Sequence, residues 1–198
     1  ASDLSLQSGN VWVGGGPYPA QSTLAVALAK FVPLFPRMSV RLVIRDWDEL
    51  LRLLRNRDIE FFVAETSTLQ HEVDVEIEPL PLHPVYFAAR AGHPLATCRD
   101  MIATDTFAYP FVTLSRIPPR MLEPLRAERR KSADSAAAKR SFPALECNAL
   151  SVITRVVLDS DAVMATTLTS IGAELESGQL TLLWSEPWLY SNYGIVKM

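Results

Sequence analysis

Cysteine is scarce in this chain of 198 residues, and the two that occur are too few for a disulfide scaffold. Long hydrophobic runs are also missing, since the longest falls far short of the roughly 20 residues that a membrane span needs. Residues 1–4 carry neither the basic nor the apolar region of a signal peptide. We therefore expect a soluble, cytoplasmic protein with no membrane partner.

Charge of one sign is equally limited, because 19 basic residues are offset by 22 acidic ones and the net charge is −3. Such a chain has no overall basic surface for gripping nucleic acid. Neither a Gly-x-Ser-x-Gly turn nor a phosphate-binding Gly-x-x-x-x-Gly-Lys loop occurs. The three histidines, at 71, 83 and 93, are dispersed and form no metal-ligand spacing with Cys, Asp or Glu. We expect no enzyme activity, no metal and no cofactor.

The residues that are present describe an ordinary globular domain, with 48% hydrophobic and 21% charged residues. Apolar and alternating runs predict strands, whereas Ala- and Leu-rich or amphipathic runs predict helices. Asp46 and Glu49 have the spacing of a capping box at the start of the second helix, and Pro124 is expected to break or kink the third. Strands are predicted at 11–13, 40–44, 59–64, 85–90, 111–114, 145–147, 162–166, 180–183 and 193–197, and helices at 20–35, from 46, 120–135, from 148 or 151 to 159, and 170–177.

Strands and helices alternate over the first 65 residues with short connections, which favours a sheet of parallel strands covered by helices. Residues 79–84 contain three prolines and predict a rigid, extended connector. The alternation then restarts. The sequence alone therefore indicates two α/β units joined by a proline-rich crossover.

Several segments, in this order, resemble the effector-binding domain of LysR-type transcriptional regulators. They are Val11-Trp12-Val13-Gly14, the stretch 31–37 ending Leu34-Phe35-Pro36, the leucine-rich stretch 50–64, the crossover 79–96 ending His93-Pro94-Leu95-Ala96, and the closing run 156–183. Each motif is weak alone, but the ordered set covers the chain from about residue 10 to 197. Ser160-Asp161-Ala162-Val163 and Thr166-Thr167 depart from the family's usual Gly-x-Gly-Ile and Leu-Pro.

The resemblance implies a fold and an assembly. It implies a two-lobed α/β fold of the type-2 periplasmic-binding-protein kind, each lobe a mostly parallel sheet flanked by helices. Lobe I would span residues 10–82 and lobe II residues 83–198. The family's N-terminal DNA-binding domain and its C-terminal return helix would lie outside this chain, so any contact with DNA would run through that missing domain.

The same resemblance implies where a small-molecule effector would bind, in a cleft between the lobes. Carried over position by position, the residues facing the ligand would be Gly16, Tyr18, Pro19, Trp47, Glu65, Asn148, Leu150, Thr166 and Thr167.

Two of these positions have alternative interpretations. The run Gly14-Gly15-Gly16 lets backbone N–H groups approach a ligand, or it simply forms a tight turn from strand to helix. A carboxylate at Glu65 would repel an anion, which favours a neutral or cationic effector beside the aromatic Trp47 and Tyr18. Alternatively, Glu65 pairs with Arg45 or another basic residue and only shapes the pocket.

The helix at 20–32 is apolar on nearly all sides, so one sheet cannot cover it entirely. Family members form dimers through this helix, and we expect a homodimer here; whether the full-length protein is a tetramer stays open. The main alternative function is an extracytoplasmic solute-binding protein of the same fold. Cys98 and Cys147 are interpreted as ordinary free cysteines rather than a redox switch, since the surroundings of Cys147 are not basic.

Overall fold

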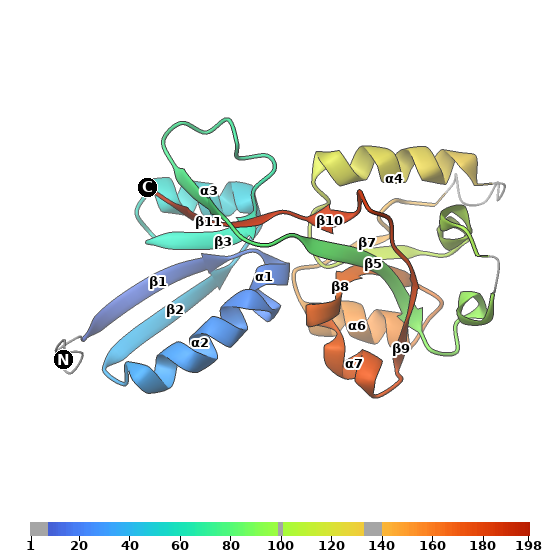
Figure 1. Cartoon of the computed structure of the whole chain (residues 1–198), viewed down its shortest axis with the longest axis horizontal. Coiled ribbons are helices and arrows are strands. Elements are labelled where there is room, and N and C mark those ends of the chain that lie inside the picture. Colours follow the sequence, from blue (N-terminus) through green and yellow to red (C-terminus); the bar gives the residue numbers. More distant parts are fainter. Residues whose placement is uncertain (1–7, 99–100, 133–139) are drawn as a thin grey trace. The chain divides into compact units, whose positions relative to one another are not determined.

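The computed structural model describes residues 8–98, 101–132 and 140–198. The chain forms two units, of which the first comprises Ala1–Pro81 and Asn192–Met198 and the second Leu82–Ser191 (Figure 1). In unit 1 the strands are β1 (Gly9–Gly15), β2 (Met38–Ile44), β3 (Phe61–Glu65), β4 (Glu76–Pro79) and β11 (Tyr193–Lys197), and the helices are α1 (Pro17–Gln21), α2 (Thr23–Leu34) and α3 (Trp47–Arg55).

The sheet of unit 1 has the strand order β2-β1-β3-β11-β4. β1 pairs in parallel with β2 and β3, whereas β11 is antiparallel to both β3 and β4. The chain thus returns from unit 2 to supply an interior strand of unit 1. The sequence predicted that lobe II runs to residue 198. In the structure, residues 192–198 belong to unit 1 instead, because β11 pairs with β3 and β4.

The two faces of this sheet are covered by different helices (Figure 1). On one face, α3 buries Leu50, Leu51 and Leu54 against Phe62. On the other, Leu24 of α2 packs against β1 and β3. Gly14 permits the close approach of α3, since a Cβ there would lie 2.7 Å from the Leu50 Cδ2. Each face therefore has its own small core.

In unit 2 the strand order is β10-β5-β8-β6-β7, and β9 also pairs with β5. β5 is antiparallel to its three partners, whereas β6 is parallel to β7 and β8. Both sheets therefore combine parallel and antiparallel pairs. The strands are β5 (His83–Arg90), β6 (Phe111–Thr113), β7 (Leu145–Glu146), β8 (Val163–Thr167), β9 (Leu180–Trp184) and β10 (Tyr190–Ser191), and the helices are α4 (Pro119–Lys131), α6 (Leu150–Leu158), α7 (Gly172–Glu176) and 3₁₀ turns at Pro94–Thr97, Ala103–Ala108 and Leu168–Ser170.

The core of unit 2 is aromatic on the side of α4. Phe87 on β5 stacks against Trp184 with ring centroids 4.3 Å apart and against Phe111 at 5.3 Å. Met121 and Leu125 of α4 close over this group. On the opposite face, α6 buries Ile153 and Val157 (Figure 1).

Two local predictions were wrong, and of the break or kink expected at Pro124 the break was wrong. The helix expected at 20–35 is two helices, because the backbone at Ser22 leaves helical geometry with φ −120° and ψ −88°. Asp46 occupies the N-cap position of α3 but makes no side-chain capping bond, and Glu49 instead pairs with Arg45. α4 continues through Pro124 rather than ending there.

Candidate functional site

One group of candidate residues lies in unit 1, at the edge of its sheet where β1, β2 and β3 end. These three strands are parallel, and Gly15 is in register with Ile44 on one side and Val63 on the other. α1 begins at Pro17 directly after β1, and α3 begins at Trp47 soon after β2. We call this the unit 1 edge; it holds Gly16, Tyr18, Pro19, Trp47 and Glu65.

The residues that follow β1 mostly make contacts within unit 1 itself. Gly16 donates its N–H to the Val63 carbonyl at 2.7 Å, and a Cβ at this position would lie 3.3 Å from that of Ala64. Gly16 and Pro19 are buried, whereas Tyr18 and Trp47 are half-buried. The turn interpretation thus accounts for Gly16, and the two aromatic side chains are the accessible part of this set.

Glu65 is buried, with 8% of its surface exposed, and its carboxylate accepts two backbone hydrogen bonds. Oε2 accepts the N–H of Asn192 at 2.8 Å and Oε1 accepts the N–H of Ser67 at 3.2 Å. Arg45, considered above as a partner, pairs with Glu49 at 3.1 Å instead. The carboxylate therefore serves the scaffold through two backbone donors, and its negative charge stays at the unit 1 edge.

Sequence reasoning missed the hydroxyl groups directly after β3. Ser67 Oγ and Thr68 Oγ1 are buried, and neither has a hydrogen-bond partner among the described residues. Thr66, by contrast, donates from Oγ1 to the Asn192 carbonyl at 3.1 Å. Buried hydroxyls are normally satisfied, so these two are candidates for binding a ligand or water. Three consecutive hydroxyl residues at a strand end were the available signal.

Another group of candidate residues lies in unit 2, at the edge of its sheet where β6, β7 and β8 end. Thr113 is in register with both Glu146 and Ala165, so the ends of these strands are neighbours. Asn148 is exposed just before α6, and Leu150 is the first, half-buried residue of that helix. We call this the unit 2 edge.

The two threonines at the end of β8 are both buried, with 0% and 2% of their surface exposed, but their hydroxyl groups have different partners. Thr166 is completely buried, and its Oγ1 lies 3.4 Å from the Thr167 carbonyl. Thr167 Oγ1 lies 3.2 Å from Thr169 Oγ1 and 2.9 Å from Ser170 Oγ. Thr167, Thr169 and Ser170 therefore form a hydroxyl cluster at the unit 2 edge, whereas the Thr166 hydroxyl contacts the backbone. Thr169 and Ser170 were not anticipated.

His93, in the His-Pro-Leu-Ala segment, has a structural role. Its ring is 1% exposed, and Nδ1 accepts the Leu95 N–H at 3.0 Å. Nε2 lies 3.3 Å from the Asp161 carbonyl, which makes it the donor nitrogen. Burial lowers the pKa of His93 below its ordinary value of 6.5, although the Asp161 carbonyl partly opposes this. His93 thus connects β5 to the segment before β8 as a neutral imidazole.

Neither a metal site nor a membrane-spanning helix is found in the part of the chain that the structure describes. No group of three or more His, Cys, Asp or Glu side chains there is arranged to hold a metal ion. None of its helices combines the length and the hydropathy needed to cross a bilayer. Cys98 is exposed and Cys147 half-buried, both as free thiols.

Comparison with known proteins identifies a family and a fold. The sequence matches the LysR substrate binding domain over residues 5–197. It is 30% identical over 199 residues to the "SDS degradation transcriptional activation protein" of Pseudomonas sp. (strain ATCC 19151), covering 98% of this chain and 62% of that protein. The chain therefore spans less than two thirds of the curated relative's length.

Solved structures agree on the fold. The Synechocystis PCC6803 CcmR regulatory domain in complex with 2-PG has a TM-score of 0.71 at 14% identity, covering 96% of this chain and 88% of that one. HinK, a LysR family transcriptional regulator from Pseudomonas aeruginosa, has a TM-score of 0.67 at 16% identity, covering 100% and 65%. Together with the family match, this shows that the chain belongs to the LysR substrate-binding domain family and is an effector-sensing regulatory domain of the LysR type, with the periplasmic-binding-protein-like fold.

Proposed function

We propose that this domain binds its small-molecule effector at the unit 1 edge and the unit 2 edge, and thereby controls a DNA-binding segment of the full-length regulator. The observation that carries the proposal is the position of the candidate residues. In both units they follow the carboxyl ends of parallel strands, where α/β folds bind ligands. An effector that favours one of two conformations shifts their populations by its difference in affinity.

We further propose that the effector carries an anionic head, of the sulfate, phosphate or carboxylate type. Ser67 and Thr68 supply hydroxyl groups at the unit 1 edge, and Thr167 and Ser170 supply them at the unit 2 edge. α6 begins at the unit 2 edge without an acidic residue in its first turn, and the amide groups at the start of a helix favour negative charge. The relative's name refers to SDS, an alkyl sulfate, and the CcmR domain is in complex with 2-PG, which agrees with this class. The competing class is the neutral or cationic effector considered from the sequence.

Calorimetric titration separates the two classes. We expect hexyl sulfate to bind the wild-type domain more tightly than hexan-1-ol and hexylammonium, which share its tail. Replacing both hydroxyl groups, S67A/T68V, should weaken hexyl sulfate about tenfold or more, since hydrogen bonds to charged groups contribute about 1.5–3 kcal/mol each. T97V, at an exposed position in unit 2, is the matched control. Tighter binding of hexylammonium, unchanged by S67A/T68V, would support the cationic class instead.

We propose that a second copy of the chain covers α2, giving a homodimer through helix 20–32. Leu24 is the only residue of α2 that is buried, while Val26, Val32 and Leu34 are 59%, 58% and 71% exposed. Lys30 is the only charged residue of the helix. Exposing such an apolar surface to water is unfavourable, and its burial against a partner would be favourable.

We also propose that the full-length protein acts in the cytoplasm, where a transcriptional regulator meets its DNA, and that it is not an enzyme. The family is one of regulator domains, and the relative's name describes transcriptional activation. These comparisons do not favour the alternative of an extracytoplasmic solute-binding protein.

A further inference from the structure

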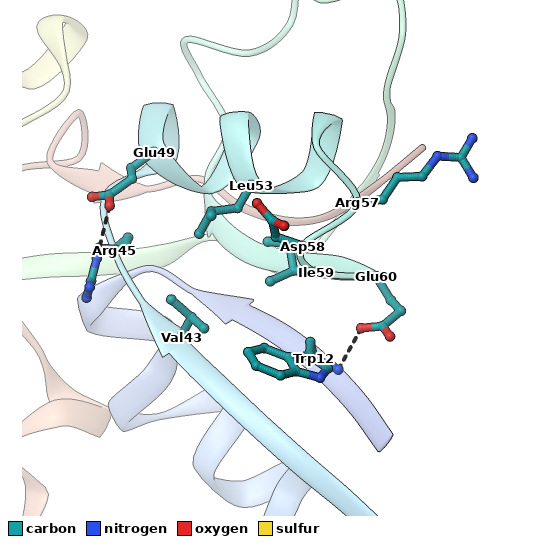
Figure 2. Close-up of a pocket in the computed structure, with 9 residues that line it drawn as sticks. All are labelled: Trp12, Val43, Arg45, Glu49, Leu53, Arg57, Asp58, Ile59 and Glu60. Atoms are coloured by element: carbon teal, nitrogen blue, oxygen red, sulfur yellow. Dashed lines mark hydrogen bonds and ion pairs between the residues drawn. The ribbon is translucent and has the colours of Figure 1, made fainter. Parts of the chain in front are cut away.

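A pocket of about 520 Å³ opens in unit 1 beside the edge strand β2, on the face of the sheet that α3 covers (Figure 2). Its size is within the range of small-molecule sites in proteins. Its walls come from β1, β2, α3 and the loop from α3 to β3. The residues lining it are Trp12, Val43, Arg45, Glu49, Leu53, Arg57, Asp58, Ile59 and Glu60.

This pocket is separate from the candidate effector residues of unit 1. Arg45 and Glu49 of the pocket lie on either side of Trp47 in the sequence, whereas Trp12 lies in the middle of β1 and residues 57–60 precede β3. None of the residues assigned to the unit 1 edge lines the pocket. A ligand bound here would therefore be distinguishable from the effector.

The pocket lining is partly apolar and partly charged, and Trp12 forms an aromatic wall. Val43, Leu53 and Ile59 supply aliphatic surface, and the Trp12 ring lies beside Val43 (Figure 2). The outer part of this ring is accessible, since Trp12 is 38% exposed. The ring already attracts a cation, because the Arg41 guanidinium carbon lies 4.4 Å from its centroid. The pocket therefore offers a ligand both aliphatic surface and an aromatic ring.

Asp58 and Glu60, two carboxylates that line the pocket, are outside the Arg45–Glu49 ion pair, and the Arg41 guanidinium lies over the Trp12 ring. Arg45 is engaged by Glu49 in an ion pair of 3.1 Å, and the Arg57 side chain points away from the pocket (Figure 2). Asp58 is exposed, and its carboxylate lies on the pocket side between Leu53 and Ile59 (Figure 2). Glu60 accepts the Trp12 backbone N–H through Oε2 at 2.6 Å, which fixes a second carboxylate at this end.

We infer that this pocket binds a small organic cation with an apolar body, such as an arylalkyl- or alkylammonium. The apolar part would pack on Val43, Leu53 and the Trp12 ring, and the ammonium group would lie near Asp58 and Glu60. Carboxylates beside an aromatic face favour cations over neutral and anionic molecules of the same shape. The site is outside the proposed effector site and does not depend on it.

Titration with three probes of one shape tests the charge preference. Phenethylammonium should bind the wild-type domain about tenfold more tightly than 2-phenylethanol, and phenylacetate should not bind detectably. D58N/E60Q, which keeps the shape of both side chains, should weaken phenethylammonium about tenfold. E78Q removes an exposed carboxylate from β4 of the same unit and should leave binding unchanged. Thermal melts establish that each variant is folded.

The indole N–H signals in an NMR spectrum locate the bound cation. W12F identifies the Trp12 signal by its disappearance and should itself weaken phenethylammonium. We expect the Trp12 signal to shift on titration while that of Trp47, at the unit 1 edge, does not. Equal binding of the ammonium and the alcohol, equal weakening by E78Q and D58N/E60Q, or a shift confined to Trp47 would each overturn the inference.

Discussion

At the residue scale, Glu65 shows how a residue chosen for ligand binding can instead be part of the scaffold. Its carboxylate holds Ser67, two residues later, and Asn192, 127 residues later. Asn192 directly precedes β11, so this contact fixes the point where the chain re-enters unit 1. The residue is buried, and a buried carboxylate requires such donors.

The variant E65Q tests this role. Glutamine retains one acceptor oxygen but turns an NH₂ group toward a backbone N–H, so one hydrogen bond is lost and a donor is left facing a donor. We expect the free energy of unfolding to fall by about 1–3 kcal/mol, measured by urea denaturation. E78Q on the exposed strand β4 should change it little. An unchanged stability in E65Q would contradict the structural role.

His93 makes stability depend on pH. Because burial lowers its pKa in the folded chain, the unfolded chain binds a proton first as the pH falls. The stability that neutral His93 contributes is complete above pH 6.5, its ordinary pKa. This contribution decreases as the pH falls below 6.5, until the pH passes the lowered pKa of the folded chain. Arg90, Asp161 and the Tyr109 ring, centred 4.4 Å from the imidazole, face it.

We therefore expect the wild type to lose stability between pH 7.5 and 5.5 more steeply than H93Q, by at most about 1.4 kcal/mol per pH unit. Urea unfolding of both proteins across this range measures the difference. Titratable groups common to both proteins cancel in the comparison. Identical slopes would show that His93 does not titrate differently in the folded and unfolded chains.

At the element scale, α2 and α3 show that two helices on one sheet can have opposite burial. α3 buries three leucines and carries charged residues on its other side. α2 buries one leucine, and its remaining surface is mostly apolar and exposed. The pattern of α3 is that of a helix on a monomer surface, whereas the pattern of α2 agrees with the proposed homodimer.

Charges placed on the exposed side of α2 test the proposed homodimer. V26E/V32E changes two side chains that are more than half exposed, so the fold of unit 1 should persist. We expect the mass in solution, measured by light scattering, to fall from that of a dimer to that of a monomer, because a buried, unpaired carboxylate opposes association. V73E, at a fully exposed loop position, is the control. A dimer that survives V26E/V32E would place the interface elsewhere.

At the scale of the whole molecule, unit 1 is discontinuous in sequence, and its sheet depends on the last residues of the chain. β11 lies between β3 and β4 and hydrogen-bonds to both. Val196 of this strand is completely buried. Unit 2, in contrast, is one continuous segment of the chain.

Ending the chain after Ser191 tests this arrangement. Removal of residues 192–198 leaves β3 without one of its two neighbours and β4 with none, and it exposes the leucines that pack near Val196. We expect amide hydrogen exchange to lose protection throughout unit 1 while unit 2 retains it. Removal of Met198 alone, which is exposed, should have no such effect. Protection retained in β1–β3 would show that this part of the sheet is stable without β11.

The amino-acid sequence by itself determined the local elements and the family. Apolar alternation located nearly every strand, and the spacing of Trp47, Leu50, Leu51 and Leu54 located α3, because these signals depend on neighbours within a few residues. Contacts between distant segments were decided only by the tertiary structure. These include the return of β11 into unit 1, the Glu65–Asn192 contact, the burial of Thr166 and the pocket beside Trp12. Each depends on which segments pack together, and a linear pattern of residues does not contain that information.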